Sequence, residues 1–111
     1  MKRYVGDRTP KGCNVMIIDE EGGKEPLDPR YDLRSHSSNG HEFDFSGSGA
    51  AQLSLAVLAD ALADDDKAQE FYQDFKMKVV SRLAGDTFDL SEKDIQRAVS
   101  QLEAERGRRQ G

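Results

Sequence analysis

The sequence contains a single cysteine, Cys13, no tryptophan and only two histidines among its 111 residues. One cysteine excludes an internal disulfide and a zinc site built on several cysteines. Its apolar neighbours predict a buried, unreactive thiol. Long apolar runs are also missing, since the longest, Leu55–Ala59, is far short of the ~20 residues that span a bilayer. No apolar stretch follows Lys2 and Arg3, so we expect neither a signal peptide nor a membrane segment, and a cytoplasmic location.

The histidines do not belong to a recognisable metal or catalytic motif. His36, His41 and Glu42 match no spacing that is typical of a helical or finger-type metal site. The order of serine, histidine, cysteine and acidic residues along the chain matches no known hydrolase arrangement. We therefore expect no catalytic residue, no metal and no cofactor, and the sequence favours a non-catalytic protein over an enzyme.

Charge is distributed unevenly along the chain. The 16 lysines and arginines and the 21 aspartates and glutamates give a formal net charge of -5. Residues 1–40 are neutral, residues 41–75 have a net charge of -7, and residues 76–111 have a net charge of +2. An acidic middle repels phosphates, so nucleic acid is not the expected partner. It favours a basic protein surface, although Asp64 to Asp66 also suit the start of a helix.

The first half of the chain predicts short strands separated by turns. We expect strands at residues 3–5, 13–18, 24–27 and 41–45. The second of them has apolar side chains at both parities, which is typical of a central strand. Pro26 lacks an N–H group and therefore places the third at an edge of the sheet. A turn is expected at Gly6 and Asp7, directly after the first strand.

The second half predicts three helices. Residues 50–63 are apolar on almost every side, which is typical of a helix in the centre of a core or of one that buries a face in a homodimer. The second helix is expected to run from an N-cap at Asp64 or Asp65 to Leu83. The third is expected to run from an N-cap at Ser91 to Gly107.

These elements predict an α+β fold. We expect a small antiparallel sheet of three to four strands, packed against the central helix and flanked by two further helices. Residues 1–105 are expected to form this one domain, and residues 106–111 a flexible, basic C-terminal tail.

One candidate anion site lies where the last expected strand leads into the first helix. Gly47, Ser48 and Gly49 occupy this junction, and free N–H groups at a helix start favour a phosphate or a carboxylate. The alternative is that Ser48 only caps the helix while the glycines allow a sharp turn.

Arg30, Arg34 and His36 are a second group that suits an anion. In an extended segment these side chains share one face, and two guanidinium groups can hold an anion by paired hydrogen bonds. The alternative is an ion pair of Asp32 with Arg30 or Arg34, which would hold a loop to the domain.

Four blocks of the sequence are similar to a known family, in order along nearly the whole chain. They are Tyr4-Val5-Gly6-Asp7-Arg8, residues 26–37, residues 47–53 and residues 72–76. The blocks resemble an uncharacterised family, a domain of unknown function, of small proteins from bacteria, archaea and their phages or plasmids. The chain departs from it at Asp44, where an aromatic-rich stretch is usual. The resemblance implies a small accessory protein, in some cases of mobile-element origin, and it implies no substrate or cofactor.

The sequence thus favours a non-catalytic accessory or regulatory protein that binds a macromolecular partner, expected to be a protein with a basic surface. The alternative is a small-molecule or phosphate-type anion-binding protein, or an enzyme, that uses Gly47, Ser48 and Gly49 at the helix start. A homodimer formed through the apolar helix is compatible with either function.

Overall fold

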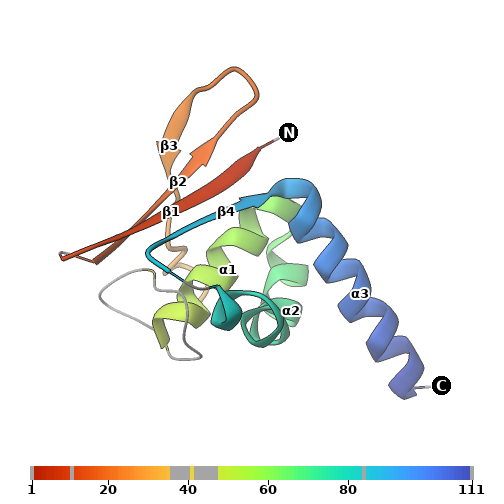
Figure 1. Cartoon of the computed structure of the whole chain (residues 1–111). Helices are drawn as coiled ribbons and strands as arrows, with labels where there is room; N and C mark the ends of the chain where they lie inside the picture. Colours follow the sequence, from red (N-terminus) through yellow and green to blue (C-terminus); the bar gives the residue numbers. More distant parts are fainter. Residues whose placement is uncertain (1, 11, 36–40, 42–47, 84, 111) are drawn as a thin grey trace.

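The computed structural model describes residues 2–10, 12–35, 41, 48–83 and 85–110 (Figure 1). The fold is α+β, as the sequence predicts. Its elements, in chain order, are β1 (Arg3–Thr9), β2 (Gly12–Ile18), β3 (Lys24–Pro26), α1 (Ser48–Leu62), α2 (Asp65–Lys78), the 3-10 helix η1 (Val80–Arg82), β4 (Thr87–Ser91) and α3 (Glu92–Gln110). The sheet lies on one side of α1, and α2 and α3 lie on the other side (Figure 1).

The four strands form one antiparallel sheet in the order β3-β2-β1-β4. The central position of β2 and the edge position of the short β3, which ends at Pro26, confirm the sequence prediction. The predicted turn at Gly6 and Asp7 is wrong, because both residues lie inside β1 and pair with Val15 and Asn14 of β2. Glycine is needed at position 6 for another reason, because the ring of Phe88 on β4 occupies the space that a Cβ would take.

The fourth strand comes from a part of the chain where the sequence analysis expected none. β4 directly precedes α3 and pairs with β1, so that Phe88 lies opposite Gly6 and Leu90 opposite Tyr4. The strand expected over residues 41–45 lies outside the described residues except for His41.

Helix α1 forms the centre of the core. Every residue from Ala50 to Ala59 is buried, and the helix shares one apolar cluster with the inner face of the sheet, α2 and α3. The two polar side chains in this stretch have internal partners: Gln52, described below, and Ser54, whose Oγ donates to the Ala50 carbonyl oxygen at 2.8 Å. The apolar surface of α1 is therefore accounted for within one chain, as the central-helix alternative predicts.

Both predicted N-caps of the later helices are confirmed. An Asp64 carboxylate oxygen accepts a hydrogen bond from the Lys67 N–H at 3.0 Å, and the Ser91 Oγ accepts one from the Asp94 N–H at 3.0 Å. Each bond satisfies an N–H group that the helix itself leaves without a partner.

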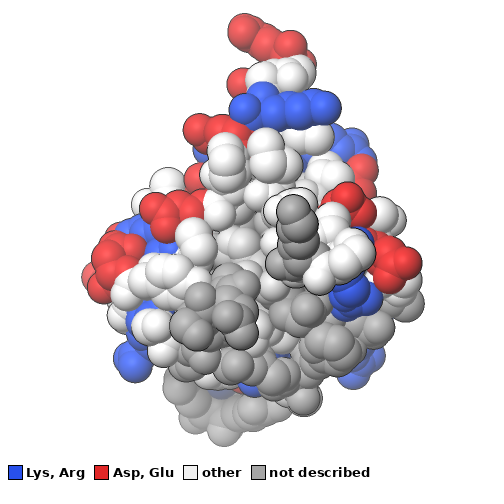
Figure 2. All heavy atoms as spheres, turned by 90° about the vertical axis from the view of Figure 1, so that its left-hand side faces the viewer, with Lys and Arg blue, Asp and Glu red and all other residues white. Residues whose placement is uncertain are grey.

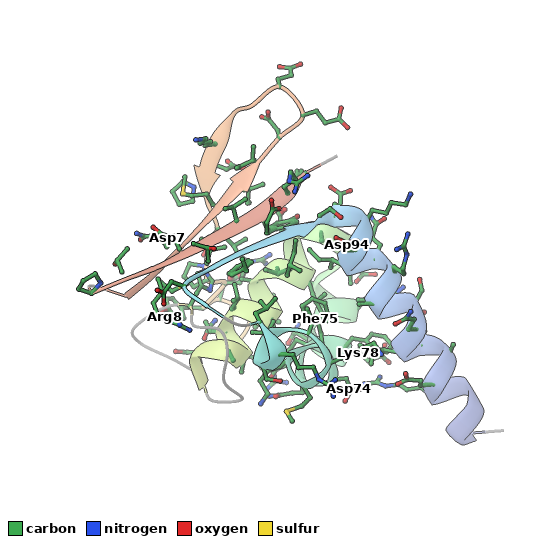
Figure 3. All side chains as sticks on the ribbon, in the orientation of Figure 1. Asp7, Arg8, Asp74, Phe75, Lys78 and Asp94 are labelled. Carbon is green, nitrogen blue, oxygen red and sulfur yellow. The ribbon has the colours of Figure 1, made fainter. Side chains whose placement is uncertain are left out.

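The C-terminal ends of α2 and α3 differ from the prediction. α2 ends at Lys78 rather than Leu83, because the chain tightens there into η1. α3 does not end at Gly107 but continues to Gln110. The guanidinium carbon of Arg106 lies 4.1 Å from the centre of the Phe71 ring, and the same group donates to Asp74 at 2.8 Å. Figure 3 shows Asp74 on the part of α2 that faces α3. The flexibility expected for residues 106–111 stays a prediction.

We predict that Gly6→Ala lowers the free energy of unfolding by about 1–3 kcal/mol, because the new methyl group would overlap the Phe88 ring. Gly107→Ala is the matched control. Gly107 is exposed within α3 with open space around it, so alanine should raise stability by up to about 1 kcal/mol. Urea unfolding followed by circular dichroism measures both changes, and equal effects of the two substitutions would contradict the prediction.

Candidate functional site

A cleft of about 510 Å³ lies between β3 with the loop that follows it and the C-terminal half of α1 with the start of α2. Its lining is half apolar and half charged. The apolar residues are Ile17, Pro26, Leu27, Ala56, Ala59 and Ala63. The charged residues are the carboxylates Glu25, Asp28, Asp60 and Asp65 and the two cations Lys2 and Arg30. Segments far apart in the sequence thus meet at one surface feature.

Arg30 ties the loop after β3 to the first turn of α2. Its guanidinium donates to both carboxylate oxygens of Asp32, at 3.0 and 3.1 Å, and to both of Asp65, at 3.1 and 2.8 Å. These hydrogen bonds, first those to Asp32 and then those to Asp65, raise the pKa of Arg30. The same guanidinium lowers the pKa of Asp32. The Arg30–Asp32 ion pair expected as an alternative is therefore present, but both residues belong to the loop, and the pair of Arg30 with Asp65 holds the loop to α2.

The backbone at Arg30 is in the left-handed region, with φ of 60°. Few residues other than glycine adopt this conformation, and it needs support from neighbouring groups. An Asp28 carboxylate oxygen supplies that support by accepting the Arg30 N–H at 2.9 Å. The Arg30 carbonyl oxygen accepts the Leu33 N–H at 3.0 Å and so closes the following turn. The loop is thus built to present the Arg30 side chain toward α2.

Gln52 holds the same loop from the inside. Its side chain is completely buried, and its Nε2 donates to the carbonyl oxygens of Pro29 at 2.6 Å and of Arg34 at 3.0 Å. The loop therefore has two attachments, one buried on α1 and one charged on α2.

The far end of the cleft carries a second polar group. The buried Tyr4 hydroxyl donates a hydrogen bond to Asp60, and the Lys2 ammonium lies 3.4 Å from the same carboxylate. Burial, followed by the contact with Asp60, raises the pKa of the Tyr4 hydroxyl. Asp60 thus connects β1 to α1 at the cleft, and its charge is balanced by Lys2.

The predicted anion-binding residues are only partly described. The Arg30 guanidinium binds two carboxylates, and Arg34 is exposed and supplies a backbone carbonyl to Gln52. His36, Gly47 and the Ser48 side chain lie outside the described residues, and Gly49 belongs to the first turn of α1. An anion site at Gly47, Ser48 and Gly49 therefore stays a prediction.

The sequence does not indicate the cleft carboxylates as a group. Glu25 and Asp28 lie in the first third of the chain, where acids and bases balance, and Asp65 was read as a helix-start residue. Nothing in the local pattern relates these positions to Asp60, because the relation depends on how the loop after β3 packs on α1. The excess of acidic residues over residues 41–75 is the one sequence feature that points to this cluster, and it includes Asp60 and Asp65 but not Glu25 and Asp28.

His41 lies in a second hollow of about 550 Å³, which residues 13–16 of β2 also line. The side chain is only 8% exposed, and its Nε2 lies 3.2 Å from the Leu27 carbonyl oxygen. Because a carbonyl only accepts, Nε2 carries the proton, and the buried Nδ1 has no hydrogen-bond partner among the described residues. Burial lowers the pKa of His41, because the charged imidazolium loses its hydration there.

Among the described residues, no three histidine, cysteine or acidic side chains are grouped so that they could hold a metal ion. Within the same part of the chain, no helix combines the length and the apolar character that crossing a membrane requires. The Cys13 side chain is only partly buried, whereas the sequence predicts a buried, unreactive thiol.

The fold and the cleft together define a small α+β protein in which a four-stranded antiparallel sheet and three helices enclose one helix-centred core. The chain belongs to the family of unknown function DUF6166, whose family model matches residues 4–101. The resemblance to an uncharacterised family is thereby confirmed. Comparison with curated proteins and with solved structures gave no match.

We predict an energetic coupling between Arg30 and Asp65. A double-mutant cycle with Arg30→Lys and Asp65→Asn should give a coupling of about 0.5–1 kcal/mol, because lysine cannot form the forked pair and the site is partly solvated. The cycle of Arg34→Lys with Asp65→Asn is the control and should be additive. Urea unfolding measures each variant. Additivity in both cycles would show that the ion pair does not hold the loop.

We predict that the folded protein loses stability on mild acidification because of His41. With its pKa lowered in the folded state, His41 binds a proton more readily in the unfolded chain. The free energy of unfolding should therefore fall as the pH decreases from about 7 through about 6.5, the ordinary histidine pKa. The fall should level off below the pKa of the folded state.

Unfolding in urea between pH 5.5 and 7.5 measures this loss. His41→Phe should flatten the profile, whereas His36→Gln should leave it as in the unmodified protein. A profile that is flat in His36→Gln and unchanged in His41→Phe would contradict the prediction, because it would assign the loss of stability to His36.

Proposed function

We propose that this protein is a non-catalytic accessory or regulatory protein that acts in the cytoplasm and binds a protein partner through a basic surface of that partner. The observation that carries the proposal is the gathering of carboxylates around the cleft. Glu25, Asp28, Asp60 and Asp65 line it, and Asp64 and Asp66 flank Asp65 along the chain.

The cations of the cleft compensate only part of this negative charge. Lys2 is paired with Asp60, and Arg30 is paired with Asp32 and Asp65. Glu25 and Asp28 are exposed and have no cationic partner among the described residues. Figure 2 shows further acidic side chains at the tip of the hairpin that joins β2 and β3. Exposed carboxylates attract a basic protein and speed its association.

The test is affinity capture of the partner by the tagged full chain in its native host, followed by measurement of the affinity for the purified partner. Raising the salt from 50 to 500 mM should weaken binding by roughly tenfold or more, since added ions screen exposed charges. The double variant Glu25→Lys, Asp28→Lys should weaken binding by a similar factor at low salt.

The control variant is Glu21→Lys, Asp94→Lys, which reverses two exposed carboxylates that do not line the cleft. It changes the net charge equally and should reduce binding much less. A partner whose affinity does not change with salt, or a captured small molecule in place of a protein, would contradict the proposed function.

A further inference from the structure

We propose that the cleft between β3 and α1 receives one lysine or arginine side chain of the partner, with its apolar stem on the cleft floor and its cationic head between Glu25 and Asp28. This inference rests on the proposed function and specifies it, because it names the chemical group that the cleft recognises. Two properties of the cleft carry the inference together: an apolar floor and an uncompensated charge on one wall.

The floor consists of small or deeply packed apolar side chains. Ala56 and Ala59 of α1, Ile17 of β2 and Leu27 directly after β3 lie at the bottom and are at most 5% exposed. Pro26 and Ala63 line the same cleft and are exposed. Pro26 and Ala63 therefore supply the apolar surface that an incoming stem contacts, above the buried side chains of α1 and β2. The chain of three or four methylene groups in arginine or lysine suits such a floor, since these residues bury their stems against apolar surface.

The two walls differ in charge. On the wall formed by α1 and α2, Asp60 and Asp65 are held by Lys2 and Arg30, so that this wall is close to neutral. On the wall formed by β3 and its loop, Glu25 and Asp28 carry two charges that no cation of the described part of the chain pairs with. An incoming ammonium or guanidinium group therefore finds its charge complement on the β3 wall. A carboxylate or phosphate would be repelled there.

The rigidity of the site supports the same occupant. Gln52 and the Arg30–Asp65 pair hold the loop that carries Asp28, and the β2–β3 pairing of Ile17 with Glu25 holds the other carboxylate. The charged wall is thus positioned before binding, which lowers the entropy lost when a long side chain is immobilised.

The experiment uses the full chain and two peptides of equal charge, hexa-lysine and hexa-diaminobutyrate, whose side chains have four and two methylene groups. Methyl signals of Ala63, which is exposed in the cleft, and of Ile17, Leu27, Ala56 and Ala59 beneath it are followed by NMR during titration at low salt. Hexa-lysine should shift these methyl signals in a saturable manner. The short-stem peptide should bind at least several-fold more weakly and should leave the Ala56 and Ala59 methyl signals nearly unchanged.

The variant Glu25→Gln, Asp28→Asn should reduce hexa-lysine affinity by roughly tenfold, whereas Glu21→Gln, Asp94→Asn should change it little. Both pairs are exposed and remove the same charge, and the unchanged methyl spectrum checks that each variant is folded. Equal affinities for the two peptides, shifts confined to residues outside the cleft, or equal effects of the two variants would each overturn the inference.

Two results distinguish a failure of the cleft as the docking site from a failure of the proposed function. A captured partner that binds in a salt-dependent manner but is insensitive to Glu25→Gln, Asp28→Asn would leave the proposed function in place and refute the cleft as its docking site. Absence of any salt-dependent protein partner would refute the function itself.

Discussion

Helix α1 is enclosed by the sheet on one side and by α2 and α3 on the other, so every polar group that it carries in its buried stretch needs a partner inside the protein. Ser54 satisfies this condition within its own helix. Gln52 cannot, and its amide instead binds two carbonyl oxygens of the loop after β3. One buried amide therefore dictates where the chain from Pro29 to Arg34 runs, and a completely apolar residue at position 52 would leave that loop without its inner attachment.

The cleft follows from this arrangement. With the loop fixed by Gln52, the backbone at Arg30 directs its guanidinium to Asp65, and Asp28 supports the left-handed turn. The loop then forms one side of the cleft, and α1 with its small alanines forms the bottom. A packing requirement of the core thus produces both the shape of the cleft and the placement of the carboxylate that faces it.

Much of the fold could be predicted from the sequence, because many of its features depend only on residues that are close together along the chain. The caps at Asp64 and Ser91, the edge position imposed by Pro26 and the apolar surface of α1 are of this kind. β4 was missed because its five residues join a helix directly, and only pairing with β1 identifies Phe88 and Leu90 as strand residues. Gly6 was misread for the same reason, since a distant aromatic ring decides its role. At the candidate site, the Arg30–Asp32 pair was within reach of sequence reasoning, but the approach of Glu25 and Asp28 to α1 was not. This approach depends on the hydrogen bonds of Gln52 to carbonyl oxygens that lie 18 and 23 residues away along the chain.

The central strand β1 pairs with β2, which follows it at once, and with β4, which lies near the other end of the chain. During synthesis on the ribosome these two pairings cannot form at the same time, because β4 is added long after β2. At ordinary rates of synthesis, the roughly 80 residues between β1 and β4 take about 4–16 s to be added. Throughout that interval the hairpin of β1 and β2 has an unpaired edge along Tyr4 and Gly6, and the sheet closes only when Ser91 has left the exit tunnel.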